Sequence, residues 1–197
     1  MEKKKKALES LTVMTNIVLP NETNSLRNLF GGELLARMDR CASISASRHS
    51  ERRVVTASVN HVSFNAPIPE GSVVVLESKV SRAFSTSMEV YVDAWLDDPI
   101  HRKKIHTNAG IYTFVAVDEF NKPVPVPELE PETAEEIERY KAALRRKELS
   151  LILSGRMKPT ESVELKSFCR RDLNLLNNKN DPADLIFKSA GCFISLH

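Results

Sequence analysis

The sequence predicts an α+β fold in which one long helix is enclosed by a curved antiparallel sheet. A run of good helix formers extends from Glu33 to about Arg48, and segments with strand-like composition follow it. The apolar face of that helix consists mostly of small residues. Small residues let a sheet approach the helix backbone closely, as expected where the sheet wraps around the helix.

Length and composition fit one well-packed domain with a helical appendage. The 197 residues are 42% hydrophobic and 27% charged. We assign residues 7–127 to the core domain and residues 128–197 to a C-terminal helical extension and tail. The 28 basic and 26 acidic side chains leave a net charge of +2, which indicates neither nucleic acid nor an anionic membrane as a partner. No apolar run predicts a secretory signal or insertion into a membrane.

The three cysteines, Cys41, Cys169 and Cys192, are scattered along the chain without paired spacing. Such a set favours reduced thiols and therefore a cytoplasmic location. With the five histidines they form no metal-like cluster. We predict no metal site and no cofactor.

Five strands are expected, one before the long helix and four after it. The third of the later group is best defined, because Val90, Val92 and Ala94 alternate there with wetter residues such as Glu89 and Asp93. The expected strands cover residues 7–18, 54–64, 72–82, 87–96 and 104–117. The prolines between residues 123 and 127 are expected to form an extended spacer.

The long helix is expected to be amphipathic, and a second helical region follows the spacer. The buried face of the long helix is predicted to consist of Leu34, Leu35, Met38, Cys41, Ala42, Ser45 and Ala46. Its polar face is predicted to consist of Glu33, Arg37, Arg40, Ser47 and Arg48. Thr133 and Glu136 predict a capping box that opens a charged helix ending near Leu153. A weaker helix is expected over residues 160–176, and the apolar groups near residues 185–187 and 192–194 require a partner.

The candidate chemistry lies at the start of the long helix. Glycines at positions 31 and 32 allow a ligand to approach unpaired backbone N–H groups at the positive end of the helix dipole. These N–H groups could form an oxyanion hole. Asp39, two turns further on, could activate water, and Asn24 could orient the water or the carbonyl. Each feature also has an ordinary explanation: the glycine pair as a structural turn, and the aspartate as a solvated side chain.

Two histidines are rivals for the role of general base. His49 lies at the end of the helix, where an imidazole commonly interacts with the last carbonyls. His61 lies inside a predicted strand, where packing or hydrogen bonding is the usual role. We rank both below Asp39.

The segment from Thr23 to Asp39 reads TNSLRNLFGGELLARMD. It closely resembles the signature of the cytosolic acyl-CoA hydrolases of the hotdog superfamily. The resemblance continues in an ordered series of motifs and covers about Met14 to Leu153. The further motifs are Val54–Ala57, Val62–Phe64, Ser85–Val90, Tyr112–Asp118, Pro131–Thr133 and Arg145-Arg146.

The resemblance implies a hotdog fold and hydrolysis of fatty acyl-CoA to a free fatty acid and coenzyme A. It further implies that two units pair edge to edge, with Asn24 and Asp39 acting together from opposite sides of the interface, and that three such dimers assemble into a hexamer. A strand edge hidden by pairing is also a physical reason for a homodimer. Gly32 is then the oxyanion donor, and Gly31 and Thr56 are substrate-binding residues.

The same resemblance assigns coenzyme A binding to the segment before the third strand of the later group. Its residues are Arg82, Ser85, Thr86 and Ser87. Guanidinium and hydroxyl groups suit phosphate oxygens. Phe84 stands where many relatives have glycine, a departure that bears on the local backbone. The charged helix after Thr133 has two readings: a solvated face or subunit contact, and a site for coenzyme A phosphates.

Three functions remain open from the sequence. The first is direct hydrolysis by water, for which a covalent route through Asp39 uses the same residues. The second is a non-catalytic acyl-CoA binding or sensing protein on the same fold. The third is a hotdog dehydratase or hydratase, which ranks last because no histidine precedes the helix that begins near Gly31.

Overall fold

The computed structural model describes residues 4–98 and 102–162. They belong to two compact units, one extending to Ala143 and the other beginning at Leu144. Within the described ranges, every helix is too short or too polar to cross a bilayer. The expected features at residues 185–187 and 192–194, and most of the helix expected at 160–176, lie outside the described residues.

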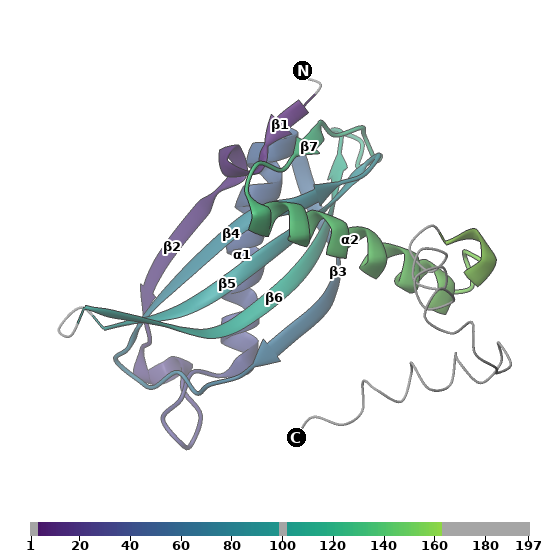
Figure 1. Cartoon of the computed structure of the whole chain (residues 1–197). Coiled ribbons are helices and arrows are strands. Elements are labelled where there is room, and N and C mark those ends of the chain that lie inside the picture. Colours follow the sequence, from purple (N-terminus) through teal and green to yellow (C-terminus); the bar gives the residue numbers. More distant parts are fainter. Residues whose placement is uncertain (1–3, 99–101, 163–197) are drawn as a thin grey trace, which may run out of the picture. The chain divides into compact units, whose positions relative to one another are not determined.

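A five-stranded antiparallel sheet dominates the first unit, in the order β2-β4-β5-β6-β3. The sheet curves around the long helix α1, Gly31–Ser50, which lies behind it in Figure 1. The predicted architecture of one helix enclosed by an antiparallel sheet is therefore confirmed. The strands are β2 Thr12–Ile17, β3 Arg53–Phe64, β4 Val73–Ala83, β5 Ser87–Asp98 and β6 Lys103–Val117.

The inner face of the sheet and the apolar face of α1 form the core. Val90, Val92 and Ala94 of β5 are fully buried, as predicted, and Asp93 on the other face is partly exposed. Glu89, expected to be wetter, is instead only 3% exposed, and its carboxylate accepts a hydrogen bond from Ser81 Oγ at 2.6 Å. Close contact depends on small groups, because a Cβ added to Gly110 of β6 would lie only 2.7 Å from the Met38 methyl group of α1. The helix residues that pack against the sheet are Leu34, Met38, Cys41, Ala42 and Ala46.

One residue of α1 is placed differently from the expectation. Arg37 was expected on the polar face, but it is only 5% exposed. Its Nη2 donates to the Glu22 carboxylate at 2.6 Å and lies 3.4 Å from the Ile17 carbonyl oxygen. A buried charge requires such a partner, and the helical pattern alone gave no sign that the preceding loop supplies one.

The N-terminal segment also differs from the expected single strand over residues 7–18. Ala7–Ser10 forms a short 3-10 helix, η1, in which Ser10 Oγ donates to the Ala7 carbonyl oxygen at 2.7 Å. Before it, β1 Lys4–Lys6 pairs in parallel with β7 Glu128–Glu130. The segment directly after the proline spacer is thus a short strand, which local composition did not reveal because its pairing partner lies near the start of the chain.

Helix α2, Ala134–Leu153, begins at the predicted capping box. The Glu136 amide donates to Thr133 Oγ1 at 3.1 Å, and the Thr133 amide donates back to the Glu136 carboxylate at 3.3 Å. The first part of α2 lies on the face of the sheet opposite α1 (Figure 1). The second unit contains the rest of α2 and the short 3-10 helix η3 Pro159–Glu161, and its Ser162 hydroxyl donates to the Glu148 carboxylate at 2.5 Å.

His49, near the end of α1, is fully buried and bonded to the proline spacer. Its Nε2 lies 2.9 Å from the Pro127 carbonyl oxygen. A carbonyl oxygen only accepts, so Nε2 carries the proton and Nδ1 is left without a partner among the described residues. Burial lowers the pKa of His49 below its ordinary value. His49 therefore acts as a neutral structural donor, which removes it as a rival general base.

Lowering the pH should destabilise the wild type through His49. Below about pH 6.5 the unfolded chain takes up a proton that the buried imidazole does not, so the free energy of unfolding falls by up to ~1.4 kcal/mol per pH unit until the lowered folded pKa is reached. His49→Gln keeps an amide donor for the Pro127 oxygen but does not titrate. Urea unfolding of both proteins from about pH 8 to about pH 5 measures the effect. If the difference in free energy of unfolding between the wild type and His49→Gln does not change with pH, this prediction is contradicted.

Candidate active site

The loop that precedes α1 is closed by the side chain of Asn24. Its Oδ1 accepts hydrogen bonds from the amides of Leu26, at 2.9 Å, and Asn28, at 3.2 Å. The backbone N–H of Asn24 donates to the backbone carbonyl oxygen of Asn28 at 2.8 Å. Arg27 adopts a positive φ of 55°, which completes the loop. Because Oδ1 is occupied by the loop, the Nδ2 group is the part of the side chain that remains to act on a ligand.

The loop is fixed to the start of the helix through Glu22. The Phe30 amide donates to the Glu22 carbonyl oxygen at 3.0 Å, and the Glu22 carboxylate accepts from the Leu19 amide and from Arg37. The hydrogen bond from Arg37 is the main reason that the pKa of Glu22 lies below its usual range. The position of Asn24 relative to α1 thus depends on this partly buried ion pair.

Helix α1 begins without a side-chain cap, because Phe30 occupies the N-cap position. The first backbone amides of the helix, including those of Gly31 and Gly32, are therefore left for solvent or a ligand. A Cβ added at Gly32 would meet nothing within 4 Å, whereas one at Gly31 would lie 3.2 Å from the Phe64 ring. The helix start is open at Gly32 and closely packed at Gly31.

A cleft of about 250 Å³ lies at this helix start. Asn24 and Gly31 line it together, so the structure brings these two predicted residues into one site. The opposite wall comes from the end of β3 and from β6. The other lining residues are Asn28, Leu29, Leu34, Phe64, Ala66, Pro67, Ile68 and Asn108.

Asp39 is half-buried on α1 and is not among the residues that line this cleft. Its Oδ1 accepts a hydrogen bond of 2.9 Å from Thr56 Oγ1, on the exposed part of β3. Burial, and secondarily the charge of Asp39, raises the pKa of Tyr112, whose hydroxyl donates to the Leu35 carbonyl oxygen. Within one chain, Asp39 and Thr56 form one group, while Asn24 and Gly31 belong to another.

The residues assigned to coenzyme A binding lie at the β4–β5 hairpin. The Phe84 amide donates to the Ser87 carbonyl oxygen at 2.8 Å, which closes the turn around Ser85 and Thr86. Arg82 Nη1 donates to the Tyr140 carbonyl oxygen at 3.0 Å, and its guanidinium lies 4.0 Å from the centre of the Tyr140 ring. Arg82 is thus attached to α2, a contact that the sequence did not indicate. Its assignment to coenzyme A stays a prediction.

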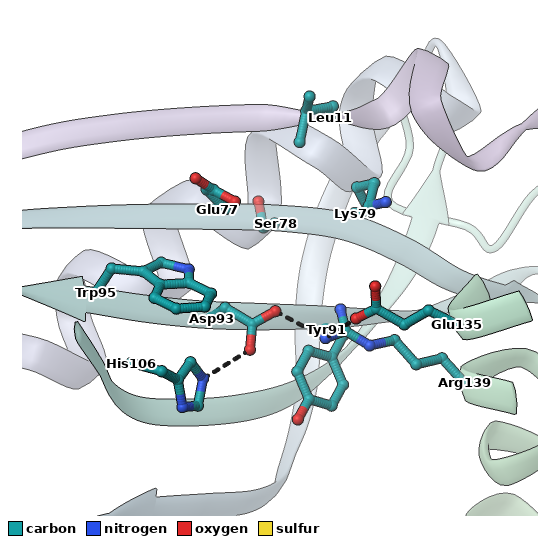
Figure 2. Close-up of a pocket in the computed structure, with 10 residues that line it drawn as sticks. All are labelled: Leu11, Glu77, Ser78, Lys79, Tyr91, Asp93, Trp95, His106, Glu135 and Arg139. Carbon is teal, nitrogen blue, oxygen red and sulfur yellow. Dashed lines mark hydrogen bonds and ion pairs between the residues drawn. The ribbon is translucent and has the colours of Figure 1, made fainter. Parts of the chain in front are cut away.

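A larger cavity, of about 480 Å³, lies on the outer face of the sheet and was not predicted. Figure 2 shows Asp93 between His106 Nε2 and Arg139 Nη2, each 2.9 Å from one carboxylate oxygen. Arg139 also lies 3.8 Å from the centre of the Tyr91 ring and pairs with Glu135. Its charge is therefore used to attach α2 to the sheet. The β5 alternation placed Asp93 on this face, but the contact with α2 required the tertiary structure.

Comparison with known proteins places this geometry in a family. The thioesterase superfamily profile matches residues 26–101. An uncharacterized acyl-CoA thioester hydrolase of Bacillus subtilis is 43% identical over 138 residues, which are 70% of this chain and 80% of that protein. An acyl-CoA hydrolase of Bacillus cereus is 37% identical, with a TM-score of 0.73 over 90% of this chain and 100% of that chain.

A third relative was solved with ligands. The acyl-CoA hydrolase of Staphylococcus aureus, in complex with butyryl coenzyme A, coenzyme A and coenzyme A disulfide, is 34% identical, with a TM-score of 0.72 over 83% of this chain and 99% of that chain. The wrapped helix, the uncapped glycine start and these similarities agree with one another. This chain belongs to the thioesterase superfamily, and within it to the acyl-CoA thioester hydrolases of the hotdog fold.

Proposed function

We propose that the protein hydrolyses the thioester of fatty acyl-CoA, giving a free fatty acid and coenzyme A. The observation that carries the proposal is the cleft at the uncapped start of α1, lined by Asn24 and Gly31, in a chain that is 34% identical to a hydrolase solved with butyryl coenzyme A. Backbone amides at a helix start favour the negative charge that develops on a thioester oxygen.

In the proposed reaction Asp39 accepts a proton from water as the water oxygen attacks the thioester carbon. The carbonyl oxygen becomes an oxyanion, held by the Gly32 amide and by Asn24 Nδ2. When the C–S bond breaks, the sulfur leaves as thiolate and takes up the proton, so the products are a carboxylic acid and a thiol. Thr56 positions the carboxylate through its hydrogen bond to Oδ1. Attack by Asp39 itself, through a mixed anhydride, remains the alternative route.

The choice of residues has further support in the Staphylococcus aureus enzyme. Three of its structures carry a single alanine in place of an aspartate, a threonine or an asparagine. The intervals between those three positions equal the intervals between Asp39, Thr56 and Asn24 in this chain. The same three side chains are therefore the ones on which we base the proposed site.

The proposed active form is a homodimer joined at β3, with Asn24 of one subunit facing Asp39 of the other. β3 is an edge strand of 12 residues, and its Val55 and Val59 are each 48% exposed. A long edge with apolar side chains is a surface for strand pairing. An acyl-CoA thioesterase solved as an apo hexamer is 40% identical, with a TM-score of 0.72 over 74% of this chain and 94% of that chain. It supports assembly into a hexamer, which we propose to consist of three such dimers.

Two other parts of the proposal concern the setting of the reaction. Water is the only second reactant, so no metal or cofactor is required. A cytoplasmic location is supported by the cytosolic acyl coenzyme A thioester hydrolases of rat, mouse and human, which are 31% to 32% identical over 136 residues. The competing function is an acyl-CoA binding protein that does not turn its ligand over.

Replacing either proposed catalytic side chain should abolish most of the activity. Asp39→Asn removes the base and should lower kcat roughly 100- to 1,000-fold, and Asn24→Ala removes one donor to the oxyanion and should lower it by about 100-fold. Release of free thiol from acyl-CoA esters between acetyl and palmitoyl measures the rates. Coenzyme A binding should persist in both variants. Tight binding of acyl-CoA by the wild type without thiol release would support the binding protein instead.

Mixing the two inactive variants should restore activity. In a dimer of one Asn24→Ala subunit and one Asp39→Asn subunit, one site receives both intact side chains and the other receives neither. Random mixing makes half of the dimers mixed, so about a quarter of the wild-type rate should return. Co-expression with two different affinity tags isolates the mixed dimer. If its rate does not exceed that of either parent, the two side chains do not meet across an interface.

A charge on the β3 edge should separate the subunits. Val59→Lys places an ammonium group where the second strand would pair, so sedimentation velocity should show a smaller species and thiol release should fall with it. Val13→Lys is the matched control, because Val13 is 53% exposed on β2, the opposite edge. Equal effects of the two substitutions would contradict pairing through β3.

A further inference from the structure

Asn108, on β6, carries a buried amide oxygen with no hydrogen-bond partner among the described residues. The side chain is 1% exposed, and its Nδ2 donates to the Ser63 carbonyl oxygen at 3.1 Å. This contact fixes the orientation of the amide, because a carbonyl oxygen can only accept and the nitrogen must face it. Oδ1 is therefore directed away from Ser63. A buried acceptor without a partner is rare in proteins and requires an explanation.

The backbone of β6 places this amide on the inner face of the sheet. Asn108 pairs with Ala94 of β5, while Trp95 pairs with His106, so the extra residue Thr107 forms a bulge. The Thr107 hydroxyl donates to the Ala94 carbonyl oxygen at 3.0 Å. Beyond the bulge, His106 contacts Asp93 on the outer face. Bulges are common beside active sites, and Asn108 is the buried inner-face residue of β6 directly next to this one.

The neighbours of Asn108 leave its oxygen unpaired because they are small or apolar. Ala94 is its partner on one side and Phe64 its partner on the other. Gly110, next along the same face, contributes no side chain. Asn108 also lines the cleft of about 250 Å³ that contains Asn24 and Gly31. An unused hydrogen-bond acceptor therefore stands in the wall of the site where the thioester is proposed to bind.

We propose that Asn108 recognises a hydrogen-bond donor of the substrate close to the thioester, an inference that rests on the proposed function. The thioester group and the phosphates offer acceptors only. Near the sulfur, the donors of an acyl-CoA are the pantetheine amide N–H, two carbons away, and a hydroxyl carried by the acyl chain. Both are neutral donors of the kind that an amide oxygen accepts. Asn108 is thus a specificity residue, separate from the residues that act on the reacting atoms.

Asn108→Leu tests the inference, because it removes the acceptor at nearly constant volume. Three substrates are compared: the straight-chain acyl-CoA that the wild type hydrolyses best, its 3-hydroxy derivative, and the S-ethyl thioester of the same acid, which has no donor. Loss of one hydrogen bond should lower kcat/KM about tenfold. The matched control is Asn16→Leu, at an exposed position of β2. Asn108→Ala serves as the second variant if the leucine variant does not fold.

Each pattern of results has one meaning. If kcat/KM falls for both CoA esters but not for the S-ethyl ester, the donor is the pantetheine amide. If it falls for the 3-hydroxy derivative alone, the donor is the acyl hydroxyl. An unchanged kcat/KM for both CoA esters, or an equal fall for all three substrates, overturns the inference; the amide then binds a water or is purely structural. A wild type that releases no thiol would overturn the proposed function itself.

Discussion

The close contact between α1 and the sheet is the constraint on which the rest of the structure depends. Met38 lies against Gly110, and further along the helix small polar groups replace bulk. Ser45 Oγ lies 2.7 Å from Ser78 Oγ on β4 and donates to Thr12 Oγ1 on β2 at 2.9 Å. These bonds join three elements in a dry interior, where unpaired hydroxyls would be strongly destabilising. They fix the rotation and the depth of the helix within the sheet.

The functional consequence appears at the helix start. A helix held rigidly by its middle presents its first amides at a fixed place, and the absence of a side-chain cap leaves them open. The partly buried pair of Arg37 and Glu22 then holds the loop of Asn24 against the same helix. The close packing of small residues between α1 and the sheet and the Arg37–Glu22 ion pair together position the proposed oxyanion site. Neither contact involves a group that takes part in the proposed reaction.

The division of the site between two groups of residues explains why the chain is proposed to act as a dimer. Asn24 and Gly31 line one cleft, whereas Asp39 and Thr56 meet beside the exposed edge strand β3. Water activation and oxyanion stabilisation must act on the same thioester group, so the proposed mechanism uses a partner subunit to bring the two groups of residues together. The outer face of the sheet is used differently, because Arg139 and Asp93 attach α2 there.

The sequence alone determined the order of the five main strands and the two long helices, the enclosed helix and the capping box of α2, because these follow from local periodicity and short-range chemistry. It also predicted Asn24, Asp39 and the glycine pair as one functional segment. The tertiary structure decided the burial of Arg37, the attachment of Arg82 to Tyr140, the pairing of β1 with β7, and the burial of Asn108 with its amide oxygen unpaired. Each of these depends on a partner far away in the chain, and sequence patterns report the neighbours along a helix or strand, not those across the core.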